Sequence, residues 1–131
     1  MRWALLDRGV ETYSAARNVA RFIKEQRGYR WVGVFERRSH KFDPTTNTMT
    51  ERAPFLALLT SEHDRPEPFL TLEMLAEYPR TIRDRHRMWT TITSRAGLLG
   101  AIEVTRETPL GRSDLIYLDM CSRSLRSIYG I

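Results

Sequence analysis

Apolar residues recur at spacings of three and four along residues 3–26, which is the pattern of an amphipathic helix with one buried face. Gly28 follows directly and predicts the end of this helix, because glycine adopts the left-handed conformation common at helix ends. A second long helix is expected from an N-cap at Ser113, with Asp114 in its first turn, to about Tyr129. The expected buried positions are Trp3, Leu6, Val10, Tyr13, Ala16, Ala20 and Ile23 in the first helix, and Leu115, Leu118, Cys121, Leu125 and Ile128 in the second.

Between the helices, short stretches rich in β-branched and aromatic residues predict strands. They lie at residues 29–38, 53–61, 87–94 and 97–106, and a tight turn at Arg95, Ala96 and Gly97 joins the last two. Residues 39–52 have the polar make-up of a loop, and residues 69–79 read as a short helix that Pro79 closes. Hairpin connections of this kind indicate an antiparallel sheet.

The expected strands are apolar on both faces. In the first, Trp31, Gly33 and Phe35 point one way, while Val32 and Val34 point the other. A sheet with two apolar faces must be covered on both sides. The terminal helices can cover one face, and only the 39–52 loop and the 62–86 segment remain for the other. We therefore expect an α+β fold with α/β/α layers and a concavity beneath the thinner cover.

One carboxylate, Glu103, stands among the apolar residues of the last strand, on the face of Leu99, Ala101 and Thr105 and opposite Leu98, Ile102 and Val104. Burying a carboxylate is costly unless it is paired. Glu103 therefore either pairs with an arginine of a neighbouring strand, or reaches water, or anchors a ligand. In the ligand hypothesis, aromatic walls surround a small pocket, and an arginine binds an anionic group. The residues concerned are Trp31, Phe35, Phe55, Trp89 and Glu103, with Arg83, Arg85 or Arg87 as the arginine.

Length and composition suit a single globular domain spanning residues 1–131, since 41% of the 131 residues are hydrophobic and 28% are charged. The only cysteine, Cys121, excludes an internal disulfide and a cysteine-rich zinc site, and it favours the cytoplasm. No apolar run is long enough for a membrane span, and none resembles a secretory signal. We expect no membrane association.

The net charge of +5 comes almost entirely from arginine, which is dense only in residues 80–87. This stretch is either a solvated loop or strand edge, or a surface that binds anions. His63, Asp64, Asp84 and His86 could meet as a mixed metal site or as an acid/base pair, but their spacing matches no fixed ligand pattern and no nucleophile accompanies them. We expect exposed polar groups there, no metal, no cofactor and no enzymatic activity.

The order of elements, the YRWVGVF strand and above all residues 87–118, RMWTTITSRAGLLGAIEVTRETPLGRSDLIYL, resemble a GAF domain. GAF domains are small ligand-sensing modules of phytochromes, phosphodiesterases and bacterial regulators. The resemblance implies a central antiparallel sheet with the N- and C-terminal helices on one face and a short helix and loop on the other. PAS and roadblock-type domains could supply comparable elements in the first half of the chain.

Cyclic-nucleotide-binding GAF domains carry N-K and then F-x-x-x-D-E at the junction of the last strand and helix. The matching positions here are Thr105 and Arg106, then Leu110, Asp114 and Leu115. Only Arg106 and Asp114 keep the chemistry, so the resemblance implies an ion pair between these two residues rather than cyclic-nucleotide binding. Bilin-binding members and free methionine sulfoxide reductases use cysteines in the pocket region, where this chain has none.

These observations favour a sensory or regulatory domain that binds a small molecule and dimerises through its terminal helices, with Ile116, Tyr117 and Met120 on the dimer surface. Because no effector domain is recognisable, the signal would pass to a separate protein. A GAF-shaped protein-interaction module with a filled pocket is the alternative. Nucleic-acid binding through the arginines of residues 80–87 is less favoured.

Overall fold

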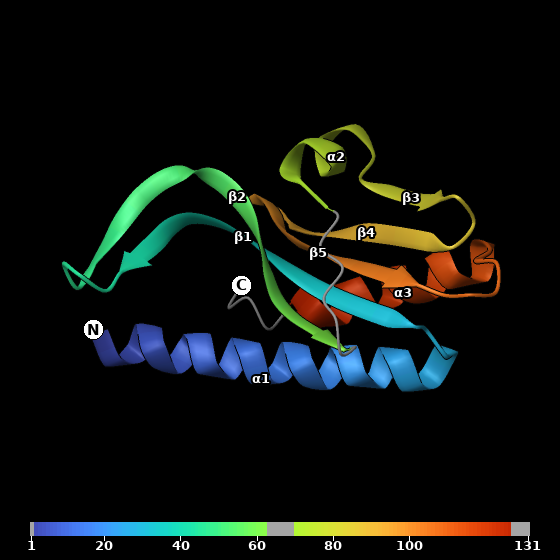
Figure 1. Ribbon diagram of the computed structural model, residues 1–131, viewed down its shortest axis with the longest axis horizontal. Coiled ribbons are helices and arrows are strands. Elements are labelled where there is room, and N and C mark those ends of the chain that lie inside the picture. The colour runs from blue at the N-terminus through green and yellow to red at the C-terminus, as the bar shows by residue number, and fades with distance from the viewer. Residues whose placement is uncertain (1, 63–69, 127–131) are drawn as a thin grey trace.

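The computed structural model describes residues 2–62 and 70–126, and in these ranges the side chains of all residues except 2–12, 41, 42 and 52. Expectations for His63, Asp64, Ile128 and Tyr129, and for the side chains of Trp3, Leu6 and Val10, lie outside the described residues. Within these ranges the chain forms three layers, with α1 and α3 on one side of a sheet and α2 on the other (Figure 1). The expected α+β layering is therefore confirmed.

The sheet is antiparallel throughout, with the strand order β2-β1-β5-β4-β3. α1 packs against β1 and β2, and α3 packs against β4 and β5, so the two long helices share one face (Figure 1). The strands are β1 (Trp31–Asp43), β2 (Thr48–Glu62), β3 (Arg80–Arg83), β4 (Arg87–Ser94) and β5 (Gly97–Thr105), and the helices are α1 (Arg2–Arg27), α2 (Leu72–Glu77) and α3 (Arg112–Arg126).

Two apolar cores lie on opposite faces of the sheet, as the two-faced strand pattern requires. The helix-side core contains five of the residues that were expected to be buried in the long helices, Ala16, Ala20, Ile23, Leu118 and Leu125, and Leu115 and Cys121 are partly buried against it. The strands contribute Val32, Val34, Met88, Ile92, Ile102 and Val104. The opposite core, beneath α2, contains Trp31, Phe35, Leu70, Leu75, Trp89 and Ala101. Tyr13 was expected in the first core but is 43% exposed, so this expectation was wrong.

A bulge in β5 corrects the expected faces of two leucines. Ile92 pairs with Gly100, but Thr93 pairs with Leu98, so β5 holds one extra residue here. An extra residue reverses the alternation beyond it. Leu98 consequently packs against the core beneath α2, and Leu99 packs against the helix-side core, the reverse of strict alternation.

Residues 39–52, expected to be a loop, instead extend the β1–β2 hairpin to a turn at residues 44–47, so this expectation was wrong. The Asp43 carboxylate accepts hydrogen bonds from the amide and hydroxyl of Thr45, and Asn47 has φ +57°. Turn signals are therefore real but confined to four residues. The flanking polar residues form strands because ladder hydrogen bonds satisfy their backbones without burying their side chains.

The 80–87 stretch contains a short edge strand, β3, which pairs with β4 and is therefore part of the sheet rather than of its cover. The expected short helix is present as α2, with Thr71 as its N-cap and Leu75 buried. α1 ends as expected, because Gly28 has φ +65° and its amide donates to the Lys24 carbonyl oxygen. α3 begins at Arg112, one residue before the expected cap Ser113.

Gly33 has no room for a side chain. The ring of Trp31, two residues earlier on the same face, lies over its Cα, so that an added Cβ would overlap the ring. We predict that Gly33→Ala lowers the free energy of unfolding by about 1–3 kcal/mol, because Trp31 is fully buried and must shift. Urea unfolding measures this. Thr93→Val, at an exposed position of β4, is the control, and an equal loss in both variants would contradict the packing explanation.

Candidate ligand-binding site

The aromatic residues expected to wall a pocket instead form a packed core. Trp31, Phe35 and Trp89 are each at most 2% exposed. The Trp89 indole N–H donates to the Tyr78 carbonyl oxygen at 2.7 Å, which ties the sheet to the end of α2. Phe55 lies apart from this cluster, opposite Arg38 in the β1–β2 ribbon, and is half-buried. These residues therefore fill the space beneath α2 rather than line a cavity there.

Glu103 points to the face beneath α2, since it lies across from Gly33 and Trp89. Its side chain is fully buried, and its Oε2 accepts from Nη1 of Arg87 at 2.8 Å. Arg87 comes from the neighbouring strand β4 and is 23% exposed. The sequence left three alternatives for Glu103: an arginine, water or a ligand. In the structure Glu103 pairs with an arginine of a neighbouring strand. This carboxylate is a buried counter-ion that orients Arg87.

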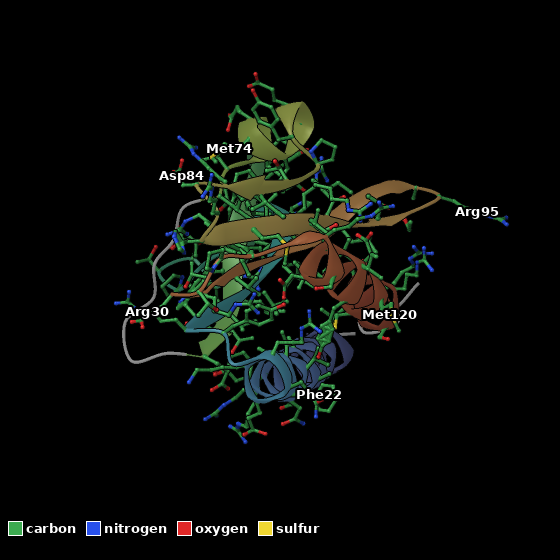
Figure 2. The ribbon with its side chains drawn as sticks, turned by 90° about the vertical axis from the view of Figure 1, so that its right-hand side faces the viewer. Phe22, Arg30, Met74, Asp84, Arg95 and Met120 are labelled. Carbon is green, nitrogen blue, oxygen red and sulfur yellow. The ribbon has the colours of Figure 1, made fainter. Side chains whose placement is uncertain are left out.

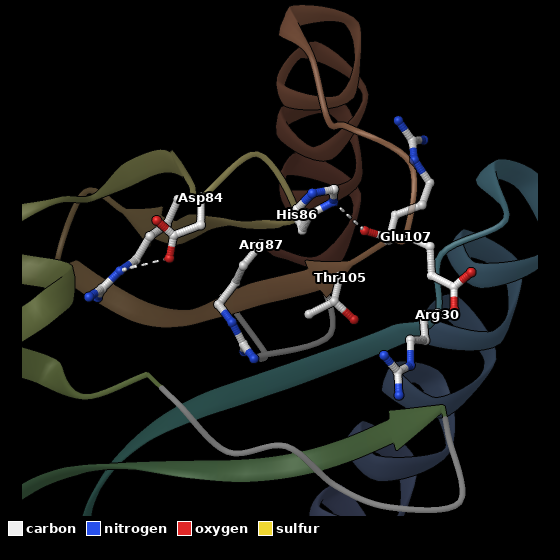
Figure 3. Close-up of a pocket in the computed structure, with 8 residues that line it drawn as sticks. Arg30, Asp84, His86, Arg87, Thr105 and Glu107 are labelled. Atoms are coloured by element: carbon white, nitrogen blue, oxygen red, sulfur yellow. Dashed lines mark hydrogen bonds and ion pairs between the residues drawn. The ribbon is translucent and has the colours of Figure 1, made fainter.

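An open pocket of about 410 Å³ lies at the end of the sheet where β1 begins and β5 ends (Figure 3). Such a volume is in the range of small-molecule sites. Four arginines, two carboxylates, one histidine and one threonine line it. They are Arg30, Arg83, Asp84, His86, Arg87, Thr105, Arg106 and Glu107. Three sequence segments supply these residues: the start of β1, the β3–β4 turn and the end of β5. We call this the sheet-end pocket.

The β3–β4 turn carries part of the pocket rim in a strained conformation. Asp84 and Arg85 both have positive φ, +54° and +64°. For a residue other than glycine this costs on the order of 1 kcal/mol or more. The turn is held by its neighbour, the β5–α3 connection: the Arg106 amide donates to the His86 carbonyl oxygen, and the Leu110 amide donates to that of Arg85. These bonds fix the rim relative to the floor of the pocket.

His86 makes a side-chain bond that fixes its tautomer. Its Nδ1 lies 3.1 Å from the Arg106 carbonyl oxygen. A carbonyl oxygen only accepts, so Nδ1 carries the proton, and the neutral ring has its lone pair on Nε2. Asp84 and His86 were expected as exposed polar groups and are exposed. Within residues 2–62 and 70–126 no group of three His, Cys, Asp or Glu side chains could hold a metal ion.

Thr105 forms the buried floor of the sheet-end pocket. It is 8% exposed, and its hydroxyl has no hydrogen-bond partner in the part of the chain that the structure describes. Its backbone carbonyl oxygen accepts from the Arg30 amide at 2.8 Å, which fixes the two residues relative to each other. A buried polar group without a partner is uncommon and costs stability.

Arg106 and Asp114 form an ion pair, the one that the family resemblance implies. The pair is bidentate, with both N–O distances 3.0 Å. Asp114 also accepts from Arg27 of α1 at 3.0 Å, from the Tyr29 hydroxyl at 2.9 Å and from the Gly111 amide at 2.9 Å. The last bond is half of a capping box at the start of α3. Burial alone would raise the pKa of Asp114, but the Gly111 amide, Arg27, Tyr29 and Arg106 outweigh it and lower that pKa to about 2.

The three residues expected on a dimer surface lie differently along α3. Ile116 and Met120 are 50% and 63% exposed, and Phe22 of α1 is 55% exposed (Figure 2). Tyr117 is half-buried, and the Arg27 guanidinium lies over its ring at 5.0 Å. Tyr117 therefore contacts α1 of its own chain, while the other two remain accessible.

The sequence analysis singled out the stretch 80–87, which contains four residues of this pocket: Arg83, Asp84, His86 and Arg87. It did not assign Arg30, Thr105 or Glu107 to a binding site. Arg30 lies directly before Trp31, the first residue of β1, and Glu107 lies just after the end of β5. The only available signal was topological. The start of the first strand and the end of the last meet in antiparallel pairing, Trp31 with Thr105 and Arg87 with Thr105.

No protein-family model matches this sequence, and no curated protein matches it. Similar solved structures include a GAF domain of a phosphoenolpyruvate-protein phosphotransferase from Acinetobacter, with 9% identity and a TM-score of 0.65 over 92% of this chain and 83% of that one. A GAF domain/HD domain protein from Geobacter sulfurreducens has 11% identity and a TM-score of 0.56 over 86% of this chain and 88% of that one. This chain thus has a GAF-like fold, as the resemblance implied.

A third similar structure is the free methionine-R-sulfoxide reductase from Neisseria meningitidis in complex with its substrate. It has 14% identity and a TM-score of 0.63, over 91% of this chain and 78% of that one. The fold is therefore shared with an enzyme. In this chain the only cysteine, Cys121, packs against the helix-side core, and burial raises the pKa of its thiol.

No helix within the described ranges is long and apolar enough to cross a membrane.

We predict that Asp114→Asn lowers the free energy of unfolding at pH 7 by about 3 kcal/mol, because Arg27 and Arg106 lose their buried counter-ion. The Asp114 pKa is about 2 in the folded chain against 3.8 unfolded, so its ionisation contributes about 2 kcal/mol. That contribution is complete above the unfolded pKa and is lost as the pH falls toward the folded one. The difference between wild type and variant should therefore shrink between about pH 4 and pH 2.

Denaturant unfolding at several pH values measures this effect. Asp84→Asn is the matched control, since Asp84 is 90% exposed and asparagine also tolerates its positive φ. We expect a change within about 0.5 kcal/mol at every pH. A pH-independent loss in the Asp114 variant would contradict the ionic explanation.

Proposed function

We propose that this chain is a sensory or regulatory domain that binds a small molecule in the sheet-end pocket. The observation that carries the proposal is the pocket itself, which is about 410 Å³ in volume. Three segments line it, and hydrogen bonds between them fix their relative positions. The fold supports it, because the similar structures include GAF domains, and these are regulatory modules. The site lies at the sheet end rather than beneath α2, where Trp31, Phe35 and Trp89 fill the space.

We further propose that the domain acts in the cytoplasm as a homodimer and signals to a separate protein. Exposed apolar side chains of α1 and α3 support the dimer: Phe22, Ile116 and Met120 are each at least half exposed. Arg106 supports the signalling step, because this one side chain lines the pocket and binds Asp114 in α3. A ligand that moves Arg106 would change the packing of both terminal helices.

A purely protein-binding module is the second candidate. The packed aromatic residues beneath α2 favour it, since the space expected to hold a ligand is occupied by side chains. The two candidates differ in what the sheet-end pocket does. The first requires a ligand there, and the second does not.

A thermal-shift screen against nucleotides, amino acids, sugars and organic acids tests the ligand. A compound that binds only the folded chain adds about 2.7 kcal/mol of stability at about 100 times its Kd. We expect at least one compound to raise the Tm of the wild type and not that of Arg30→Trp, in which an indole fills the pocket. Arg95→Trp, at the exposed tip of the β4–β5 hairpin, is the control and should keep the response (Figure 2). A screen without a hit favours the second candidate.

The dimer is tested by light scattering. We expect the wild type at about twice 15.4 kDa and the double variant Ile116→Asp, Met120→Asp at the monomer mass, since two buried carboxylates would oppose an apolar interface. Met49→Asp is matched to it, because Met49 is also exposed, 59%, but lies in the β1–β2 ribbon. Loss of the dimer in the Met49 variant alone would place the interface on the ribbon instead.

A further inference from the structure

We infer that the sheet-end pocket is a site for an oxyanion, a carboxylate or phosphate group carried by a small molecule. This inference rests on the proposed function and names the chemical class of its ligand. Four arginines and two carboxylates line the pocket, so cationic side chains predominate (Figure 3). Guanidinium groups match the planar and tetrahedral oxygens of such anions.

Two of the arginines that line the pocket are held in fixed positions by buried carboxylates. Arg87 is bonded to Glu103, which is fully buried, and Arg106 is bonded to Asp114, which is 2% exposed. Their positions are thus set before a ligand arrives, so binding need not order them. Arg30 differs from both, since its exposed side chain has no ion-pair partner in the described ranges. An anion in the pocket would supply that partner.

The floor of the pocket lacks an acceptor. The Thr105 hydroxyl is buried and, among the described residues, has no hydrogen-bond partner. An oxyanion offers only acceptors, so it would satisfy this hydroxyl as a donor. Thr105 and Arg30 are joined through the backbone, at 2.8 Å from the Arg30 amide to the Thr105 carbonyl oxygen, so a single anion can reach both.

His86 can donate a hydrogen bond to an anion only through Nε2. Its Nδ1 proton is used by the Arg106 carbonyl oxygen, so Nε2 can donate to a ligand only when the ring is protonated. The charged groups around the ring are Arg83 and Asp84 of the β3–β4 turn, Arg87 of β4, Arg30 before β1, and Arg106 and Glu107 after β5. A protonated His86 ring would therefore add one more donor for an anion bound among these groups.

Isothermal titration calorimetry of the full chain with inorganic sulfate, succinate and glycerol phosphate tests this inference. We expect saturable binding to one site, weakened about tenfold in Arg30→Ala and in Thr105→Val.

Arg95→Ala is the matched control, because it removes one exposed arginine at the far tip of the β4–β5 hairpin (Figure 2). Its affinity should equal that of the wild type. Non-saturable binding, or equal weakening in the Arg30 and Arg95 variants, overturns the inference. Arg30 is exposed, so its variant remains informative even if Thr105→Val fails to fold. Sulfate and succinate binding without glycerol phosphate binding assigns the site to carboxylates, and preferred glycerol phosphate assigns it to phosphate esters.

The thermal-shift screen separates this inference from the proposed function. If only neutral or cationic compounds raise the Tm, and the Arg30→Trp variant abolishes their effect, the domain binds a small molecule and the oxyanion inference is wrong. If sulfate binds with the predicted variant pattern but no metabolite raises the Tm, the site chemistry stands and the sensory function does not.

Discussion

The carboxylate of Asp114 is the interaction on which the other parts of this structure depend. It joins the last turn of α1 through Arg27, the start of β1 through Tyr29, the exit of β5 through Arg106 and the first turn of α3 through the Gly111 amide. Each partner comes from a different element. A carboxylate this buried is unfavourable by itself, and only the combined donors make the ionised form stable. The two terminal helices and the edge of the pocket are therefore positioned by one charged group.

The sheet solves a different problem, that of two apolar faces. The helix-side core uses small residues of α1, Ala16 and Ala20, at positions of zero exposure, so that the helix lies close to the strands. The face beneath α2 uses large aromatic residues instead. Large side chains there compensate for a cover that, among the described residues, includes only a six-residue helix. The same packing leaves the polar groups Arg87, Glu103 and Thr105 gathered at one end of the sheet.

The fold could be predicted from the sequence where apolar periodicity is strong. The strands at 87–94 and 97–106 and the opposed faces of Trp31 and Val32 follow from alternation alone. Alternation failed at Leu98 and Leu99, because a bulge changes the side-chain period and leaves no mark in local composition. It also failed at residues 39–52, where backbone pairing rather than burial stabilises the strands.

The candidate site was only partly predictable. The carboxylate of Glu103 was recognised as a group that needs a partner, but sequence spacing could not choose between an arginine and a ligand. Arg30 and Thr105 were not recognised, because their meeting depends on which strands pair and in which register. Trp31 and Phe35 were correctly expected on one face. Whether aromatic residues line a cavity or fill it is decided by packing geometry, which composition does not encode.

Arg106 lines the pocket and also binds Asp114, so the pocket wall and the helix layer share one guanidinium group. Thermodynamic linkage makes such an arrangement reciprocal. If a ligand in the pocket changes the affinity of the α1–α3 layer for a partner, that partner must change the affinity of the pocket for the ligand by the same factor. Binding at the pocket and binding at the helix layer would then each report on the other.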